Sequence, residues 1–450
     1  MRIFNTLTRK KEDFVPINTG KVGIYVCGPT VYNFIHVGNA RPYVVFDTLR
    51  RYLEHLGNTV TFVQNFTDID DKIINKANDE CIDYSDISKR YVNEFFTDVD
   101  GLNIQRASYY PRVTEEISEI ISLVSHLIDK GYAYEVGGTV YFDASKADKY
   151  GKLSKKNIED LEAGARVDIN PDKRNPSDFV LWKVAKEGEP SWDSPWGYGR
   201  PGWHIECSAM ARKYIGKTVD IHGGGVDLMF PHHENEIAQS EAEDGKFVNY
   251  WMHNEMLLVD NQKMSKSDGN FFLVRDIARK YGYPQLRFFL LSVHYRSSLS
   301  FSEELLIASN AGFERIRECR RNLVDANWGS AVETAHRRAF LDALDDDLNT
   351  ANAISAIFDL VRDANVALRE NTENSAFLAD LDFMSMLLGL EIGKTNISEA
   401  DENEIEKLIF QRDEAKKAKN WALADEIRNK LTDMGVEIKD TREGTKWHLM

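Results

Sequence analysis

A strand–loop–helix–strand succession near the N-terminus restricts the fold more than any other feature of the sequence. Residues 21–26 have the composition of a strand, and residues 60–63 repeat that pattern after Gly57, a fitting helix end. Between them, apolar side chains recur at the spacing of one helix face: Val45, Leu49, Leu53 and Leu56. Such a βαβ unit makes its two strands parallel, and its first loop lies where parallel sheets bind ligands. The sequence therefore predicts an α/β domain with a ligand site after residue 26.

The remaining chain divides by composition. Residues 112–130 have a helical pattern and residues 132–142 a hairpin pattern, and a loop-rich stretch follows. The sheet pattern resumes at residues 218–221, whereas helical patterns replace strand patterns from about Ser302. We therefore expect two halves of one α/β domain (1–114 and 201–301) around an insertion (115–200). A helical domain (302–400) and a small C-terminal piece (401–450) would follow.

Composition excludes several classes of protein. No apolar run approaches the roughly 18 residues that span a membrane, and the first ten residues lack a secretory signal, so a cytoplasmic location is expected by default. The four cysteines are far apart, which disfavours a disulfide framework. A net charge of −16 argues against a protein that coats nucleic acid non-specifically, although a local basic face could still bind it.

The first motif follows the predicted strand, in residues 29–41 (PTVYNFIHVGNAR). His36 and Asn39 are expected just ahead of a helix N-terminus, where free N–H groups and the helix dipole favour an anion. Both side chains can donate hydrogen bonds to phosphate, and Gly38 permits close approach of the backbone. His36 by itself could equally be a surface histidine at a helix entry.

The second motif is KMSKSDGN at residues 263–270. Lys263 and Lys266 lie among small polar residues, which is typical of a mobile cationic loop. Such a loop can close over a triphosphate and stabilise the charge that develops as pyrophosphate leaves. An exposed lysine-rich turn would have the same composition, but the order of the residues is more specific.

A third set of residues has the chemistry of a metal site. His232 and Glu236 are four residues apart after Pro231, so on one helix they point the same way. Together with Cys27 and Cys207 they form a plausible zinc ligand set. The spacing alone leaves alternatives open. His233 or Glu234 could replace their neighbours, and buried free cysteines are common in protein cores.

The paired HxGN and KMSKS segments resemble the signatures of class I aminoacyl-tRNA synthetases, with Asn39 where a histidine is usual. Further segments resemble the cysteinyl-tRNA synthetase family: CGPTVY at 27–32, NFTDIDDK at 65–72, GWHIECS at 202–208 and HGGGVDLMFPHHENE at 222–236. Val226 and Asp268 depart from the family pattern. The resemblance extends to residues 444–447. It implies an α/β fold, namely a Rossmann-like parallel-sheet catalytic domain with an insertion, followed by an α-helical anticodon-binding region and a small C-terminal piece that binds tRNA.

The resemblance also implies a reaction. The enzyme would activate L-cysteine with ATP and Mg²⁺ and transfer the cysteinyl group to tRNA(Cys), as a monomer. One zinc ion, bound by Cys27, Cys207, His232 and Glu236, would hold the substrate thiolate and reject serine. The catalytic residues would be His36, Asn39, Lys263 and Lys266, and ATP would contact Gly38, His36, Asn39 and Lys266.

Four residues are weaker candidates for substrate contact. Thr67 also fits, with Asp70, a capping-box-like helix start. Trp203 could be a core aromatic, although its neighbourhood favours a pocket wall. His222 precedes three glycines, which suggests backbone pressed against a ligand. Asp227 could accept a hydrogen bond from ribose or from the substrate ammonium.

Two alternatives remain open at this level. A ligase that joins activated cysteine to an amino sugar would share the site but would need no anticodon-binding region, and the residues after Ser302 weigh against it. A catalytically inactive relative that only binds tRNA is disfavoured by the intact HxGN and KMSKS segments.

Overall fold

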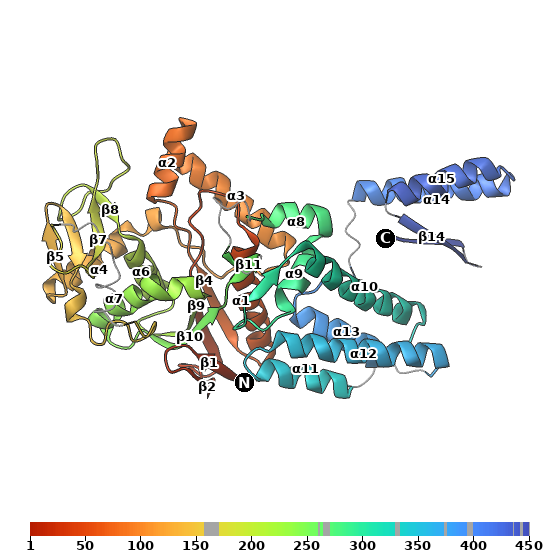
Figure 1. The fold of residues 1–450 in the computed structure, drawn as a ribbon, viewed down its shortest axis with the longest axis horizontal. Helices are drawn as coiled ribbons and strands as arrows, with labels where there is room; N and C mark the ends of the chain where they lie inside the picture. The colour runs from red at the N-terminus through yellow and green to blue at the C-terminus, as the bar shows by residue number, and fades with distance from the viewer. Residues whose placement is uncertain are drawn as a thin grey trace. The chain divides into compact units, whose positions relative to one another are not determined.

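The computed structural model describes residues 1–156, 171–259, 262–263, 271–328, 334–372, 376–393, 399–434, 436–441 and 444–449. The chain divides into two compact units, Met1–Ile392 and Gly393–Met450, which are treated separately (Figure 1). Within the described residues, no helix is both long and apolar enough to cross a membrane.

A four-stranded parallel sheet lies at the centre of the first unit. Its strand order is β10–β9–β3–β4, with β3 (Lys21–Val26), β4 (Thr59–Gln64), β9 (Val219–Gly225) and β10 (Val248–Asn254). Helix α1 (Val37–His55) connects β3 to β4, which confirms the predicted α/β fold. Strand β9 continues through the three glycines, four residues beyond the predicted strand end at residue 221.

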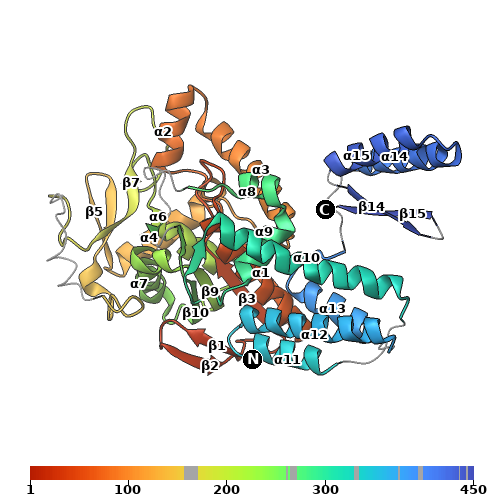
Figure 2. The same ribbon diagram turned by 45° about the vertical axis from the view of Figure 1, so that its right-hand side comes forward.

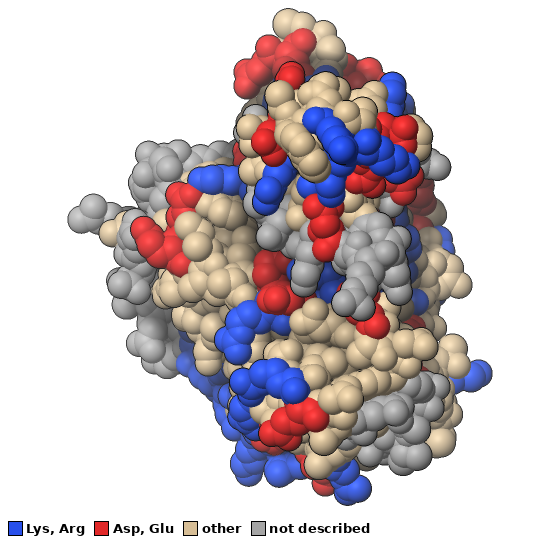
Figure 3. All heavy atoms as spheres, turned by 90° about the vertical axis from the view of Figure 1, so that its right-hand side faces the viewer, with Lys and Arg blue, Asp and Glu red and all other residues tan. Residues whose placement is uncertain are grey.

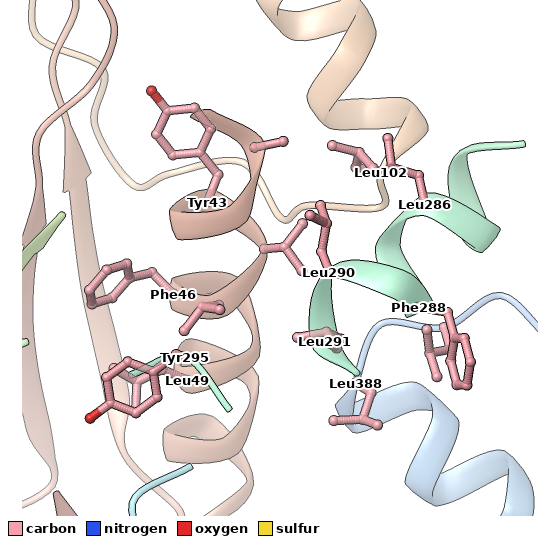
Figure 4. Packing of buried hydrophobic residues seen from close by; sticks show 14 of the residues in the cluster. Tyr43, Phe46, Leu49, Leu102, Leu286, Phe288, Leu290, Leu291, Tyr295 and Leu388 are labelled. Carbon is pink, nitrogen blue, oxygen red and sulfur yellow. The ribbon is translucent and has the colours of Figure 1, made fainter. Parts of the chain in front are cut away.

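The core of this unit forms where α1 packs on α9 (Tyr283–Leu291). Phe46 and Leu49 of α1 are fully buried, as are Leu286 and Leu290 of α9. In Figure 4, Leu290 lies between the two helices, whereas Phe46 points from α1 to the side away from α9. Burial of such side chains is the main source of stability in a domain of this kind. It fixes the start of α1 against the sheet.

The insertion contains helix α4 (Ile117–Asp129) and an antiparallel sheet of β5 (Ala133–Val136), β6 (Thr139–Phe142), β7 (Phe179–Val184) and β8 (Gly199–Pro201). The predicted hairpin is present as β5 and β6. The helix begins later than the predicted residue 112, because Arg112 forms a β-bridge with Phe66 and a 3-10 turn (Val113–Glu115) follows. Helices α2 (Asp71–Glu80) and α3 (Tyr84–Gly101) precede the insertion, and α6 (Trp203–Tyr214) and α7 (Glu234–Asp244) follow it.

Helical structure dominates the rest of the first unit (Figure 2). Its helices are α8 (Val274–Tyr281), α9, α10 (Glu303–Asp325), α11 (Ala335–Asp345), α12 (Thr350–Glu370) and α13 (Ala376–Leu387). Short strands add two small sheets: β1 (Arg2–Asn5) with β2 (Lys10–Asp13), and β11 (Leu257–Val259) with β12 (Gln262–Lys263) and β13 (Leu299–Phe301).

The buried side chain of Arg287 ties these helices to the sheet domain. Its guanidinium lies 2.5 Å from Asp47 of α1 and donates to the carbonyl oxygens of Leu102 (2.9 Å) and Leu388 (2.7 Å). One hydrophobic core spans residues from Ile3 to Ile392. The helices after Ser302 therefore share a core with the sheet domain.

The second unit consists of α14 (Glu399–Lys417), α15 (Trp421–Asp433) and a hairpin of β14 (Val436–Thr441) and β15 (Gly444–Leu449). Its small core includes Ile405, Leu431 and Val436. The sequence analysis did not predict these strands. Residues 436–439 alternate apolar and polar, as expected for a hairpin with one face packed on helices, but four residues are a short signal beside the long helical patterns before them.

Candidate active site

A cavity of about 400 Å³ opens at the carboxyl ends of the central strands. It extends from the N-terminal end of α1 to the segments that follow β3, β9 and β10, the position at which parallel sheets bind ligands. Nine of the thirteen residues predicted for the site lie in or beside this cavity. They are Cys27, His36, Gly38, Asn39, Thr67, Trp203, Cys207, Asp227 and His232.

His36 and Asn39 cap helix α1. The backbone N–H of Asn39 donates to His36 Nδ1 (3.2 Å), and the backbone N–H of His36 donates to Asn39 Oδ1 (3.3 Å). This reciprocal arrangement corrects the expectation that Asn39 precedes the helix, since it is the third helical residue. Because Nδ1 of His36 accepts a hydrogen bond, the neutral ring carries its proton on Nε2. Both side chains line the cavity beside Gly38.

The lysine-rich segment is only partly described. Lys263 ends strand β12 and pairs with Leu258 of β11. Lys266, with the rest of residues 264–270, lies outside the described residues.

The four predicted metal ligands converge from three parts of the chain. Cys27 directly follows β3, and Cys207 lies in α6. His232 lies in a π-helical turn (Met229–His233) that leads into α7, and Glu236 lies in the first turn of α7. Their ligand atoms all lie within 4.8 Å of one another, and all four residues are buried. The two Sγ atoms are 3.8 Å apart, and His232 Nε2 is 3.1 Å from Glu236 Oε1.

Charges within this cluster compensate one another. Burial opposes ionisation of Glu236, but the two imidazoles of His222 and His232 outweigh it and hold its pKa well below the usual range. Burial likewise disfavours a charged His232, yet Glu236 and Cys207 raise its pKa to about 10. Against the effect of burial, the hydrogen bond from Cys27 and the charge of His232 lower the pKa of Cys207 to about 6. The cluster therefore holds anionic ligands suited to a cation.

Further histidines orient these ligands. His222 Nε2 is 2.8 Å from Glu236 Oε2, and His204 Nδ1 is 3.0 Å from His232 Nδ1. In metal sites, contacts to the polar atom of a ligand side chain that does not bind the metal fix the orientation of that side chain. Burial lowers the pKa of His204 to about 3, so this ring is neutral.

A second group of possible ligands overlaps the first: Cys27, His222, His233 and Glu236. His233 Nε2 lies 3.4 Å from Cys27 Sγ, and its Nδ1 contacts His253 Nε2 at 2.8 Å. Neither His222 nor His233 lines the cavity, whereas Cys27, Cys207 and His232 do. A metal ion that contacts a substrate in the cavity would therefore be bound by the first group of ligands. Glu234 is excluded as a substitute, because it accepts from the backbone N–H groups of Leu153 and Ser154.

Three of the four weaker candidates line the cavity, and the fourth does not. Trp203, the first residue of α6, lines the cavity with its ring 4.3 Å from that of His232, and Asp227 lines it from a 3-10 turn (Val226–Leu228). Thr67 also lines the cavity, but its hydroxyl donates to Glu206 (2.9 Å), and Asp70 alone caps α2. His222 is fully buried behind Glu236 and does not face the cavity.

The glycines after His222 are required for packing as well as being candidates for close approach of a ligand. A Cβ atom on Gly223 would lie 1.9 Å from the ring of Phe46, so α1 could not pack on β9. A Cβ atom on Gly224 would lie 3.2 Å from the ring of His233. Gly224 and Gly225 also line the cavity, so the expectation that this backbone lies against a ligand stays a prediction.

Sequence reasoning missed the residues that orient the ligands. His204 stands three residues before Cys207, one helical turn away, and this spacing was the available signal. The buried Tyr25 also lies beside the ligands, and burial together with Cys207 raises its pKa well above the usual range, but its hydroxyl has no hydrogen-bond partner among the described residues. A tyrosine inside a strand pattern gives no indication of such a neighbourhood.

Comparison with known proteins agrees with this fold. The family described as the tRNA synthetases class I (C) catalytic domain matches residues 13–311, and the DALR domain family matches residues 339–392. Methionyl-tRNA synthetase of Mycobacterium tuberculosis, solved with methionyl-adenylate, has the same fold with a TM-score of 0.58 at 15% identity, over 83% of this chain and 89% of that one. The catalytic domain is thus that of a class I aminoacyl-tRNA synthetase.

Full-length relatives are closer. The chain is 52% identical to a cysteine–tRNA ligase of Clostridioides difficile and 53% identical to one of Finegoldia magna. Each alignment covers 99% of both chains. The chain belongs to the cysteine–tRNA ligase family.

Proposed function

We propose that the chain activates L-cysteine with ATP and Mg²⁺ and transfers the cysteinyl group to tRNA(Cys), with zinc selecting the substrate thiolate. One observation carries this proposal: a Cys–Cys–His–Glu cluster borders a cavity that begins at the N-terminal end of α1. The cavity thus offers a thiol-binding end and a phosphate-binding end.

The first step needs positioning more than covalent catalysis. The cysteine carboxylate attacks the α-phosphate of ATP, a carboxyl–phosphate bond forms, and pyrophosphate leaves. His36 offers Nε2–H and Asn39 its side-chain N–H to phosphate oxygens, and Lys263 and Lys266 would neutralise the leaving group. In the second step a ribose hydroxyl of the tRNA attacks the activated carbonyl and AMP leaves.

Selection of cysteine over serine rests on the metal site. Cys27, Cys207, His232 and Glu236 supply the ligand types that zinc prefers. Bound zinc would provide a site for a thiolate, for which a hydroxyl is a poor substitute. His222 would act through Glu236, whereas Thr67, Trp203 and Asp227 line the cavity and would contact substrate.

We assign tRNA binding to the helices of the DALR match and to the second unit, residues 393–450. Basic and acidic side chains both occur on the face drawn in Figure 3, so productive contacts to tRNA would be few and local. We propose a monomer that works in the cytoplasm. These parts also favour a tRNA ligase over an enzyme that couples cysteine to an amino sugar.

A direct test compares two activities in the purified chain. Cysteine-dependent exchange of pyrophosphate into ATP reports the first step, and cysteinylation of tRNA(Cys) reports the second. Both are expected. Exchange without charging of tRNA, but with coupling of cysteine to an amino sugar, would favour the alternative ligase.

A shortened chain of residues 1–392 should retain pyrophosphate exchange but charge tRNA poorly. The cut leaves the first core intact, whereas a cut at Ser302 would delete Leu306 and Phe313 and expose Phe288, whose ring packs on that of Phe313. Each 1.4 kcal/mol of lost contact weakens tRNA binding about tenfold. Steady-state charging at varied tRNA concentration measures this, with circular dichroism as the folding control. Unchanged tRNA affinity would show that the second unit does not contribute to tRNA binding.

A further inference from the structure

Among the described residues, one fully buried polar side chain that lines the cavity has no partner and no assigned role. Asn254, the last residue of β10, is 1% exposed and lines the cavity. Neither its Nδ2 nor its Oδ1 has a hydrogen-bond partner among the described residues. Leaving a buried polar group unpaired costs about 1–3 kcal/mol. An amide with both groups unmet therefore indicates a ligand that supplies an acceptor and a donor.

Strand geometry places Asn254 away from the metal ligands. Side chains of a strand alternate between its two faces. Trp251 stacks on His222 (4.4 Å between ring centroids), and His253 contacts His233, so these two residues face the ligand cluster. Met252 lies on the other face, within the core that contains α1. Asn254 shares that face.

The residues that follow fix Asn254 beside the start of α1. Arg41 of α1 donates to the carbonyl oxygens of Glu255 (2.8 Å) and Met256 (3.3 Å). In the sheet, Asn254 pairs with Gly225 at the end of β9. The N-terminal end of α1 favours phosphate, so the nucleoside attached to that phosphate would lie over the ends of β9 and β10.

We propose that Asn254 binds the adenosine part of ATP, an inference that rests on the proposed function. Its amide can donate and accept at the same time. Adenine presents an amino group beside a ring nitrogen, and the ribose diol also combines donor and acceptor. Asn254 is therefore a specificity residue for the nucleotide and not for the amino acid.

Steady-state pyrophosphate exchange with Asn254→Ala tests this assignment. The KM for ATP should rise about tenfold or more, since two hydrogen bonds are lost, while the KM for cysteine stays within about twofold. Asn254→Asp, which keeps the shape but removes the donor, should also raise the KM for ATP. Gln285→Ala is the matched control, because Gln285 is a buried amide with an unpartnered oxygen outside the cavity. It should leave both KM values unchanged.

Two analogues of ATP show which part of the nucleotide Asn254 contacts. If Asn254 binds the base, wild type should discriminate against ITP, and Asn254→Ala should lose that discrimination. If it binds the ribose, 2′-deoxyATP should behave in this way instead. Calorimetric binding of ATP to each folded variant separates this inference from the proposed function, since it needs no cysteine chemistry. An unchanged affinity for ATP, or an equal rise in the KM for cysteine, would overturn the assignment.

Discussion

Replacing Cys207 by serine is expected to reduce zinc content well below one ion per chain and to weaken cysteine binding by about 100-fold or more. Even residues that only orient metal ligands alter metal affinity by about 10–100-fold, and a direct ligand should matter at least as much. ATP binding should change little, because the phosphate-binding end of the cavity belongs to α1. Metal analysis and calorimetric titration with cysteine and ATP measure these effects.

Cys319→Ser is the matched control for this variant. Cys319 is also a buried free cysteine, but it lies in α10, remote from the ligand cluster. It should retain zinc and cysteine affinity at the level of the wild type. Equal losses in both variants would show that buried thiols matter for folding rather than for metal binding.

Lys266→Ala is expected to slow adenylate formation by about 10²–10³ while cysteine affinity remains nearly unchanged. Loss of one preorganised donor to a developing charge typically has this effect on the rate. Pre-steady-state formation of the adenylate measures the rate, and equilibrium titration measures binding of cysteine.

Lys89→Ala serves as the comparison, because Lys89 is an exposed lysine of α3 that pairs only loosely with Asp86 at 3.8 Å. Its rate should match that of the wild type. If Lys266→Ala reduced cysteine affinity and rate by equal factors, Lys266 would belong to the amino-acid pocket instead.

The sequence was sufficient where a local pattern determines the outcome. The strand at residues 21–26 and the helix after it follow from apolar spacing, and β3 and α1 confirm them. The proximity of Cys27 and Cys207, which stand 180 residues apart, could not be obtained from spacing. It followed only from the resemblance of whole segments to a family.

Tertiary contacts explain what the sequence did not predict. Arg112 is extended because it bridges Phe66, which delays the start of α4. Gly223 is required by the ring of Phe46, a residue of another element. The unpaired amide of Asn254 becomes visible only once β10 is placed beside α1. Each of these features depends on a neighbour that is distant in the chain.

The most direct test of the account is the preference for cysteine over serine in zinc-loaded and zinc-free protein. Serine differs from cysteine only in having oxygen in place of sulfur. The shape of a pocket discriminates poorly between groups of such similar size, since even a whole extra methylene changes the specificity of a hydrophobic pocket by only about 10–200-fold. Pyrophosphate exchange with each amino acid gives the ratio of kcat/KM values. We expect a strong preference for cysteine that collapses when zinc is removed and returns when it is restored. A zinc-free protein that still preferred cysteine by the same factor would contradict the account.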